Sequence, residues 1–236
     1  MMNSENGNMF EKLMELPLFQ GASHEQISAL VAKIPFHFLK FGDGQRIVES
    51  GAPSTHLRFI VSGKARSVTA SAAARLAVSQ TLAAPNVVGA DFMFGREPAY
   101  PFDLYAVGDC GILQLSKADY MSIVRSDDVF LFNILNYLSR NAQKPKLSLQ
   151  QMSHGMVAER IAFMVSMLTS KASADITITF RQKDLCLMLG TRRTALVSAL
   201  SLLKASGIVD YTSSSISVLD RSALVSMIHE RPVEEE

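Results

Sequence analysis

The sequence predicts an α+β fold in which an antiparallel β-domain precedes a long helix, a pair of short helices and a β-hairpin. Three observations carry this prediction. Short apolar runs separated by turn residues extend from Phe36 to Leu115, apolar residues then recur at heptad spacing from Leu131, and two short helical patterns flank Gly190. These patterns change period along the chain, which is typical of a mixed architecture.

The N-terminal segment indicates helices. The pattern from Met9 to Val31 is helical and is interrupted by "PLFQGAS". Ser23 is followed three residues later by Gln26, which is the spacing of a capping box. We therefore expect a helix that begins just after Ser23.

The β-domain is expected from Phe36 to Leu115. Its apolar runs are short and are separated by Gly, Pro, Asn and Asp, which favours an antiparallel sandwich, roll or barrel. The runs are "FHFLKF", "LRFIVSG", "LAVSQTL", "LYAV" and "GILQLS". The small-residue stretch at 69–75 is expected to be an exposed hairpin or loop.

A long helix is expected after Lys117, because apolar residues alternate at spacings of four and three. This seam consists of Leu131, Leu135, Leu138, Ala142, Pro145, Leu149, Met152 and Met156. Its regularity favours a parallel dimer, and the alternative is a long helix that lies on its own β-domain. Pro145 complicates both interpretations, because a proline inside a helix costs about 3 kcal/mol and kinks or splits it. The predicted dimer interface is Leu131, Leu135, Leu138, Ala142, Leu149 and Met152.

The last third of the chain has the pattern of a helix-turn-helix followed by a hairpin. After an expected hinge at 153–155, "MVAERIAFMVSMLTSKA" reads as an amphipathic helix and "ITITF" as a short strand. Thr179 with Gln182 predicts a capping box, Gly190 breaks the first short helix, and Gly207 ends the second. The hairpin is predicted at "IVDYTSSSISVLD". The predicted core positions are Leu185, Met188, Leu189, Leu196, Leu200 and Leu203.

The second short helix carries mostly polar residues opposite its core face. They are Arg193, Thr194, Val197, Ser198 and Ser201, with Arg192 beside them in the first turn. Cations in the first turn oppose the helix dipole by about 0.3–1 kcal/mol, so a phosphate or guanine edge outside the fold is expected to compensate. The alternative is an ordinary helical hairpin with two solvated arginines.

Composition narrows the function classes. The chain has 236 residues, 48% hydrophobic and 19% charged, which is enough for a buried core. Its net charge of +1 means that a surface for a polyanion must be local. Cys110 and Cys186 lie far apart, which excludes a four-thiolate metal site and predicts reduced thiols. No apolar run reaches about 18 residues and the N-terminus is polar, so we expect a cytoplasmic protein without a membrane partner.

The order of elements resembles the Crp/Fnr family of bacterial transcription regulators over nearly the whole chain. "GDGQRIVESGAPSTHLRFIVSGKARSV" is similar to the family's β-roll entry. "RQKDLCLMLGTRRTALVSALSLLKASGIV" is similar to its DNA-reading unit, which commonly runs Leu-Ala-x-x-Leu-Gly-x-Ser-Arg-x-Thr-Leu. The resemblance implies a cyclic-nucleotide-binding-like β-roll at 1–125, a dimerisation helix at 126–153 and a winged helix-turn-helix at 154–236.

The resemblance also implies partners and DNA-binding residues. A homodimer would read a palindrome in double-stranded DNA with two helices about 34 Å apart, and RNA polymerase would be a further partner. Gly190 aligns with the turn glycine and Arg193 with the base-reading arginine. Arg192 stands at the family's Ser position, Thr194 where some members carry Glu, and Ser198 where many carry Arg, so a different operator is expected. Arg192, Lys183 and Lys204 are candidates for phosphate contacts, and Val197 completes the predicted set.

The sensory segment departs from the family pattern. Members that bind cyclic nucleotides carry Gly-Glu-x-x-Leu-Phe followed by Arg-Ser/Thr-Ala, whose Glu and Arg grip the ribose and the phosphate. Here Ala90 follows Gly89 at the Glu position, and Tyr100, Pro101 and Phe102 stand where the Arg segment belongs. A buried phosphate without a cation is costly, so we do not expect cyclic AMP to bind in the usual way.

The aromatic residues of this segment leave two interpretations open. Phe92, Phe94, Tyr100, Phe102 and Tyr105 either fill the core or line an apolar pocket. Such a pocket suits haem or another planar ligand, in keeping with a looser similarity to the regulators of hybrid-cluster-protein genes, a nitrosative-stress branch of the family. A separate alternative for the function is a dimer that binds DNA without any effector.

An enzyme is not expected. The β-domain shape is shared with cupins, which hold metals with clustered His and carboxylates, but this region has only His37 and His56. The sequence contains neither a nucleophile elbow nor a phosphate-binding P-loop. No catalytic residue and no metal ligand are therefore assigned.

Overall fold

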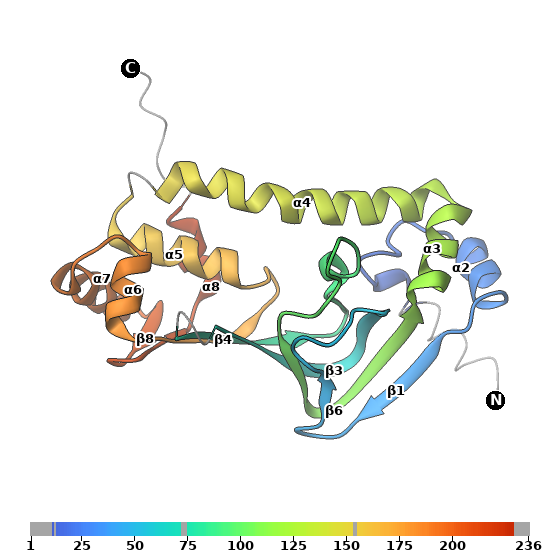
Figure 1. Cartoon of the computed structure of the whole chain (residues 1–236), viewed down its shortest axis with the longest axis horizontal. Helices are drawn as coiled ribbons and strands as arrows, with labels where there is room; N and C mark the ends of the chain where they lie inside the picture. Colours follow the sequence, from blue (N-terminus) through green and yellow to red (C-terminus); the bar gives the residue numbers. More distant parts are fainter. Residues whose placement is uncertain (1–10, 12, 72–74, 153–154, 229–236) are drawn as a thin grey trace, which may run out of the picture. The chain divides into compact units, whose positions relative to one another are not determined.

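The computed structural model describes residues 11, 13–71, 75–152 and 155–228, without the side chains of 144–152 (Figure 1). The chain forms two compact units. The first contains Met1–Arg66 and Leu82–Ala142, and the second contains Ser67–Thr81 and Gln143–Glu236. The predicted α+β class is confirmed, whereas the boundaries expected near 125 and 153 stay predictions.

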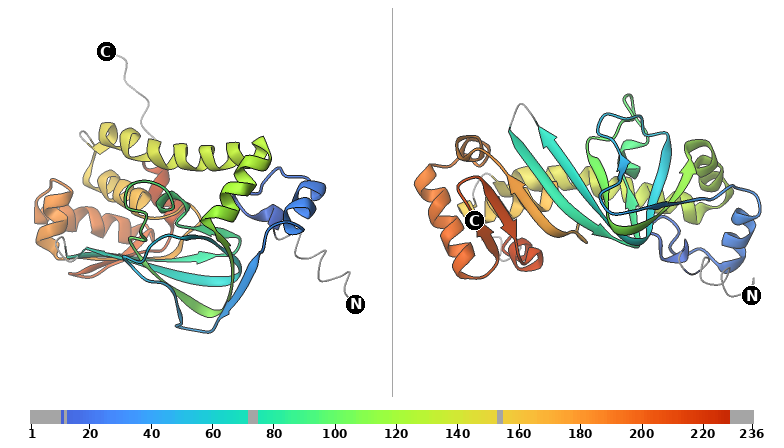
Figure 2. Two further views of the ribbon diagram at one scale, coloured as in Figure 1. Left: turned by 45° about the vertical axis from the view of Figure 1, so that its right-hand side comes forward. Right: turned by 90° about the horizontal axis from the view of Figure 1, so that it is seen from below.

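Antiparallel strands make the sheet of the first unit, as predicted from the short apolar runs. Its strand order is β1, β6, β3 and β4, while β2 pairs with β6 and β5 pairs with β3. The strands are β1 His37–Phe41, β2 Arg46–Val48, β3 His56–Ser71, β4 Leu76–Ala83, β5 Asn86–Val88 and β6 Asp103–Ser116. Figure 2 shows β3 and β4 as a long hairpin, and the loop expected at its tip lies partly outside the described residues.

Alternate residues of β3 supply two separate cores of this unit. Leu57 and Phe59 pack against the helices. In this core the centre of the Phe19 ring lies 5.6 Å from the centre of the Phe59 ring and 5.8 Å from that of Phe130. Ile60 faces the interior of the roll. The helices of this unit are α2 His24–Val31, α3 Lys117–Ser126 and the first part of α4 Asp128–Met152. The side chains of β3 are divided between two cores because successive side chains of a strand point to opposite faces of the sheet.

The capping box expected at the start of α2 is confirmed. The Gln26 amide N–H donates to Ser23 Oγ at 3.2 Å, and the Ser23 amide N–H donates to Gln26 Oε1 at 2.7 Å. Two N–H groups at the helix start are thereby satisfied by local side chains. A purely local signal was therefore sufficient to place this helix.

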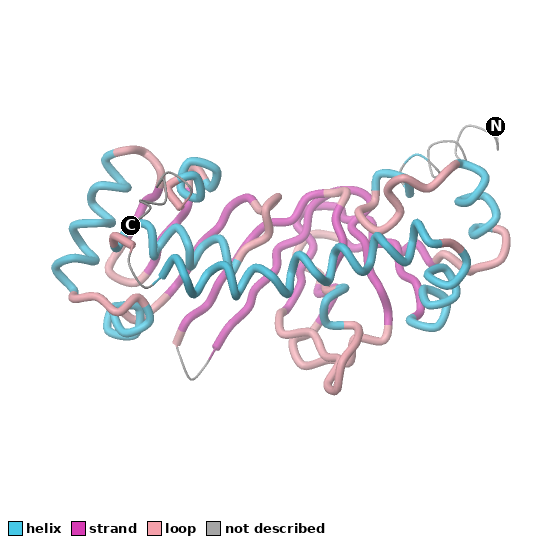
Figure 3. Tube along the Cα trace, turned by 90° about the horizontal axis from the view of Figure 1, so that it is seen from above, coloured by secondary structure: helices cyan, strands magenta, loops and turns pink. Residues whose placement is uncertain are grey.

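The predicted long helix is α4, which continues through Pro145 to Met152 (Figure 3). Phe130 and Ile134 on α4 are buried against the core of the first unit, and Leu138 packs partly against it. The neighbouring stripe is exposed, with Leu131 at 36% and Leu135 at 48% of full exposure. The helix therefore has one apolar stripe on its own domain and a second stripe that nothing in the described chain covers.

Four further positions of the predicted seam have different outcomes. Ala142 is exposed, like Leu131 and Leu135. The side chains of Leu149 and Met152 lie outside the described residues. Met156 was wrongly placed in the seam, because it caps the next helix, α5 Val157–Leu168.

The second unit contains the predicted helix-turn-helix and hairpin. Its elements after α5 are β7 Ala174–Thr179, α6 Gln182–Met188, α7 Arg193–Ala205, β8 Val209–Tyr211, β9 Ser215–Val218 and α8 Arg221–Ser226. The core lies among α5, α6, α7 and the sheet, and Ile161, Leu185, Leu196 and Leu200 are at most 2% exposed. β7 lies between two antiparallel neighbours, which are β9 and residues 77–81 of β4.

Two predictions in this unit are wrong. Thr179 does not cap α6, because it is the last residue of β7 and its hydroxyl donates to the Ala77 carbonyl at 3.5 Å. The N-cap of α6 is Arg181, which makes no side-chain cap. Met188 is 41% exposed rather than in the core, since α6 ends there and only Leu185 and Leu189 reach the interior.

Candidate nucleic-acid interface

The turn between α6 and α7 depends on a glycine, as predicted. Gly190 has φ +57°, a left-handed conformation that residues with a Cβ rarely adopt. The two helices meet at 92° across this turn. The chain can therefore turn through about a right angle within four residues and present the start of α7 outward.

Arg160 on α5 holds this turn in place. Its Nη1 donates to the carbonyls of Leu189 at 2.9 Å and Gly190 at 3.3 Å, and its Nε donates to the Gly155 carbonyl at 3.0 Å. These carbonyls lie at the end of α6 and before α5, where helix bonding cannot satisfy them. Arg160 therefore joins the start of α5 to the turn that sets the direction of α7.

Arg160→Met should destabilise the turn by about 1–3 kcal/mol, because partly buried carbonyl groups would lose their donor. Hydrogen exchange should become faster in α6 and the first turn of α7, and this is the measurement to make. Arg181→Met is the matched control, since Arg181 is exposed in the same unit. Equal exchange rates in the two variants would contradict the assigned role of Arg160.

Most predicted DNA-binding residues of α7 are brought together on its exposed surface. Arg192 is the N-cap, Arg193 is the first helical residue, and both are exposed with Thr194 and Ser198. Val197 is only partly exposed. The opposite side is buried, with Leu196, Ala199, Leu200 and Leu203 in the core. This arrangement presents polar groups along one side of a rigid helix.

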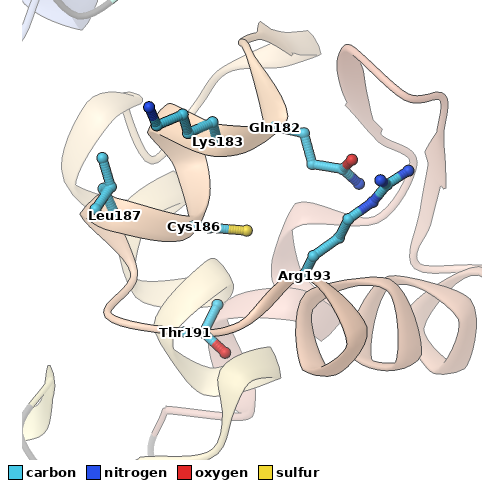
Figure 4. Close-up of a pocket in the computed structure, with 6 residues that line it drawn as sticks. All are labelled: Gln182, Lys183, Cys186, Leu187, Thr191 and Arg193. Atoms are coloured by element: carbon cyan, nitrogen blue, oxygen red, sulfur yellow. The ribbon is translucent and has the colours of Figure 1, made fainter.

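A groove of about 400 Å³ lies between α6 and the start of α7 (Figure 4). Its lining residues are Gln182, Lys183, Cys186, Leu187, Thr191 and Arg193. The Gln182 amide and the Arg193 guanidinium point toward each other across it. Lys183 and Arg193 were predicted from the sequence, whereas Gln182, Cys186, Leu187 and Thr191 were not. The four-residue spacings from Gln182 to Cys186 and from Lys183 to Leu187 were the signal for a shared helix face.

Lys204, near the end of α7, is already paired with a residue of the wing, which is the hairpin of β8 and β9. Its ammonium lies 2.6 Å from Asp210 Oδ1 and 5.8 Å from the centre of the Tyr211 ring. The hydroxyls of Tyr211 and Ser201 are hydrogen-bonded at 2.8 Å. The Lys204–Asp210 hydrogen bond raises the pKa of the lysine and lowers the pKa of the carboxyl group. The predicted phosphate contact of Lys204 therefore has an internal competitor.

In the sensory region, four of the predicted residues come together. Tyr100 is 1% exposed. The centre of the Phe102 ring lies 5.8 Å from the centre of the Tyr100 ring and 6.1 Å from that of Phe92. Gly89 has φ +61°, and a Cβ there would lie 2.9 Å from the Tyr100 ring. Ala90, which begins the short 3-10 helix η1 (Ala90–Phe92), is instead buried in the helix-side core with Phe59. The Tyr100 ring thus packs directly against the backbone of the predicted ligand segment.

The other predicted pocket residues lie elsewhere. Phe94 packs against the helix-side core, with the Lys117 ammonium 4.9 Å from its ring centre. Pro101 is exposed, and Tyr105 lies in β6 opposite Arg46 of β2. One continuous aromatic pocket with all five rings is therefore not formed.

The roll contains a cation, Arg58, that was not predicted from the sequence. Arg58 on β3 donates to Tyr100 Oη at 2.9 Å and to Gln114 Oε1 at 3.0 Å, and Tyr100 Oη donates to the His56 carbonyl at 2.7 Å. Burial lowers the pKa of His56, and the Arg58 charge lowers it further. Arg58 lies opposite Val88, immediately before the predicted ligand segment, but on a strand remote in sequence. The guanidinium is therefore occupied by the protein's own hydroxyl and amide groups.

Gly89→Ala should lower the unfolding free energy by about 1–3 kcal/mol, because the left-handed backbone would be strained and the Tyr100 ring would have to move. Urea unfolding followed by circular dichroism measures this loss. Gly44→Ala is the matched control, since Gly44 has φ +72° with no atom within 4 Å of the added Cβ. If both variants lose the same stability, the contact with Tyr100 is not restrictive.

The described residues contain no group of three or more His, Cys, Asp or Glu side chains arranged to hold a metal ion. Cys110 and Cys186 are free thiols, as expected from their separation. No single helix in the described ranges is long and apolar enough to cross a membrane. The helices α6 and α7 reach that length and apolar composition only when they are taken together, and they are bent by 92° relative to each other.

Comparisons with known proteins cover both parts of the chain. Residues 38–127 match the family described as "Cyclic nucleotide-binding domain", and residues 158–227 match the "Crp-like helix-turn-helix domain". The "Cyclic AMP receptor protein" of Thermus thermophilus is 23% identical over 213 residues, which are 88% of this chain and 94% of that protein. The crystal structure of Thermus thermophilus Catabolite Activator Protein covers 90% of this chain and 98% of its own, at 20% identity and a TM-score of 0.51. This last likeness shows a shared fold.

Proposed function

We propose that two copies of this chain, which belongs to the Crp/Fnr family of transcription regulators, read a palindromic site in double-stranded DNA. The observation that carries the proposal is the exposed start of α7, where Arg192 and Arg193 lie at a helix N-terminus beside the groove with Lys183. Arg193 would donate to a guanine edge, and Arg192 and Lys183 would contact phosphates. On this proposal the chain acts by recruiting or blocking RNA polymerase rather than as an enzyme.

The second stripe of α4 supports the homodimer. Leu131 and Leu135 are large apolar residues at a spacing of four, as in a heptad repeat. Both remain exposed, whereas their neighbours Phe130 and Ile134 are buried in the same unit. Exposed apolar residues at heptad spacing are typical of a helix that packs on a second helix. A palindromic site would offer the two copies of α7 half-sites about 34 Å apart, which is one turn of DNA.

Genome-wide mapping of bound DNA tests the proposal and supplies the operator. Fluorescence anisotropy should then give tighter binding to the mapped palindrome than to a scrambled duplex, by about 10³-fold or more. Equal affinity for the two duplexes would overturn the proposal. Size-exclusion chromatography with light scattering should give the mass of two chains at the protein concentration used.

We further propose that the roll does not bind cyclic AMP in the usual way and that the chain binds DNA without an effector. The Thermus relative is named for cyclic AMP, but here the predicted ligand segment contacts Tyr100, whose hydroxyl occupies the Arg58 guanidinium. A nucleotide or a haem would have to displace this buried ring and break its hydrogen bonds.

Calorimetric titration with cyclic AMP and a haem titration near the Soret band test the sensory proposal. We expect no heat of binding, no spectral change, and operator affinity that is the same with and without each compound. Cyclic AMP that binds and alters operator affinity would overturn the proposal in favour of an ordinary nucleotide sensor. A Soret shift with altered operator affinity would instead support the haem interpretation.

A further inference from the structure

We propose that Asp210 restrains DNA binding by holding Lys204 in the wing, so that Asp210 and the DNA backbone compete for one ammonium group. This inference rests on the proposed DNA-binding function. It assigns a role to an acidic wing residue and to a contact between the wing and α7. Phosphates of the duplex are the competing ligand.

The geometry fixes the carboxylate and leaves the lysine free to exchange. Asp210 Oδ1 accepts the Tyr211 amide N–H at 2.8 Å as well as the Lys204 ammonium at 2.6 Å. The backbone bond orients the carboxylate on β8, while Lys204 reaches it through a flexible four-carbon chain. The side chains of Lys204 and Asp210 remain 55% and 57% exposed. Water therefore reaches both groups, and a phosphate can replace the carboxylate without a large desolvation cost.

The charges of the interface make this pair unusual. In the described part of the chain, Arg192, Arg193 and Lys183 have no ion pair, whereas Lys204 of the same helix pair does. Lys204 also lies on the side of α7 that meets the wing, next to the Ser201 and Tyr211 hydroxyl pair. A duplex on the exposed side of α7 would therefore meet three cations available for contact and one that must first leave Asp210.

The consequence is a measurable change in salt dependence. Each phosphate contact adds about 0.9 to the slope of log affinity against log salt. Asp210→Asn should free the Lys204 ammonium and steepen the slope by about that amount. The variant should accordingly gain about threefold more affinity than the wild type when salt falls from about 200 to about 50 mM. Because a phosphate contact carries no base information, this gain should be the same on operator and scrambled duplexes.

A double-mutant cycle separates exchange of Lys204 from simple repulsion by Asp210. The full-length wild type, Asp210→Asn, Lys204→Gln and the double variant are compared by fluorescence anisotropy across that salt range. On this proposal the double variant matches Lys204→Gln, because the effect of Asp210 acts through Lys204. An Asp210→Asn effect that persists in the Lys204→Gln background, or no change in slope, overturns the inference.

Two controls test for a general effect of charge and for loss of folding. Asp175→Asn makes the same charge change at an exposed residue of β7 whose φ of +47° suits Asn, and it should leave the slope unchanged. Hydrogen exchange of α7 and the wing checks that every variant is folded. If the wild type does not prefer its operator over the scrambled duplex, the proposed function fails. If it does prefer the operator but the cycle shows no coupling, only this inference fails.

Discussion

Leu135→Glu should convert the proposed dimer into monomers and weaken binding to a palindromic operator by about 10²–10⁴-fold. Leu135 is 48% exposed on α4, so the substitution does not disturb the buried stripe of Phe130 and Ile134. In a parallel pair, residue 135 of one copy lies against residue 135 of the other, so two carboxylates would meet in an apolar seam. Each copy would then bind its half-site without the benefit of the linked second site.

Two measurements together check this prediction. Light scattering should give the mass of one chain for the variant, and its affinity for a full palindrome should fall to that for a half-site. Asn136→Glu is the matched control, since Asn136 is exposed on α4 and lies outside the seam. A Leu135→Glu protein that remains dimeric and binds the palindrome normally would show that the exposed stripe is not the interface.

Arg193→Ala should reduce affinity for the operator by about 10–100-fold while leaving binding to a scrambled duplex nearly unchanged. Arg193 begins α7 with its side chain exposed and directed into the groove beside α6 (Figure 4). A bidentate contact to guanine is lost only where guanine occupies that position, so the loss must depend on sequence.

Operators changed at one base pair at a time locate the contact of Arg193. The variant should lose its preference at one position of each half-site and keep its preference elsewhere. Arg192→Ala provides the contrast, because a phosphate contact should weaken operator and scrambled DNA alike and lower the salt slope. Equal weakening of both duplexes by Arg193→Ala would assign Arg193 to the backbone instead.

Local signals were sufficient for the elements that carry the proposed function. Ser23 with Gln26 located α2, the glycine at 190 located the turn, and the buried spacing of Leu196, Leu200 and Leu203 gave the orientation of α7. Each of these features depends on neighbours within about four residues. The polar side of α7 could therefore be predicted from the sequence alone.

Contacts between remote segments could not be predicted in this way. Thr179 satisfies the capping pattern, but strand pairing with β4 places it in β7. Arg58 precedes Tyr100 by 42 residues, and no local pattern brings a guanidinium to that hydroxyl. Lys204 looked like a free cation because its partner Asp210 comes from the wing, whose position depends on the fold of β8 and β9. Such tertiary contacts override local preference.

The pairing of β7 with β4 has a consequence for dividing the chain into fragments. Residues 77–81 cover one edge of β7, where Val78 lies opposite Ile178, although about a hundred residues separate them. A fragment starting at residue 154 would keep β7 but lose this cover, leaving a row of unpaired backbone groups beside apolar side chains. Uncovered strand edges of this kind recruit other copies. The fragment is therefore expected to self-associate edge to edge, whereas the whole chain protects that edge with its own distant hairpin.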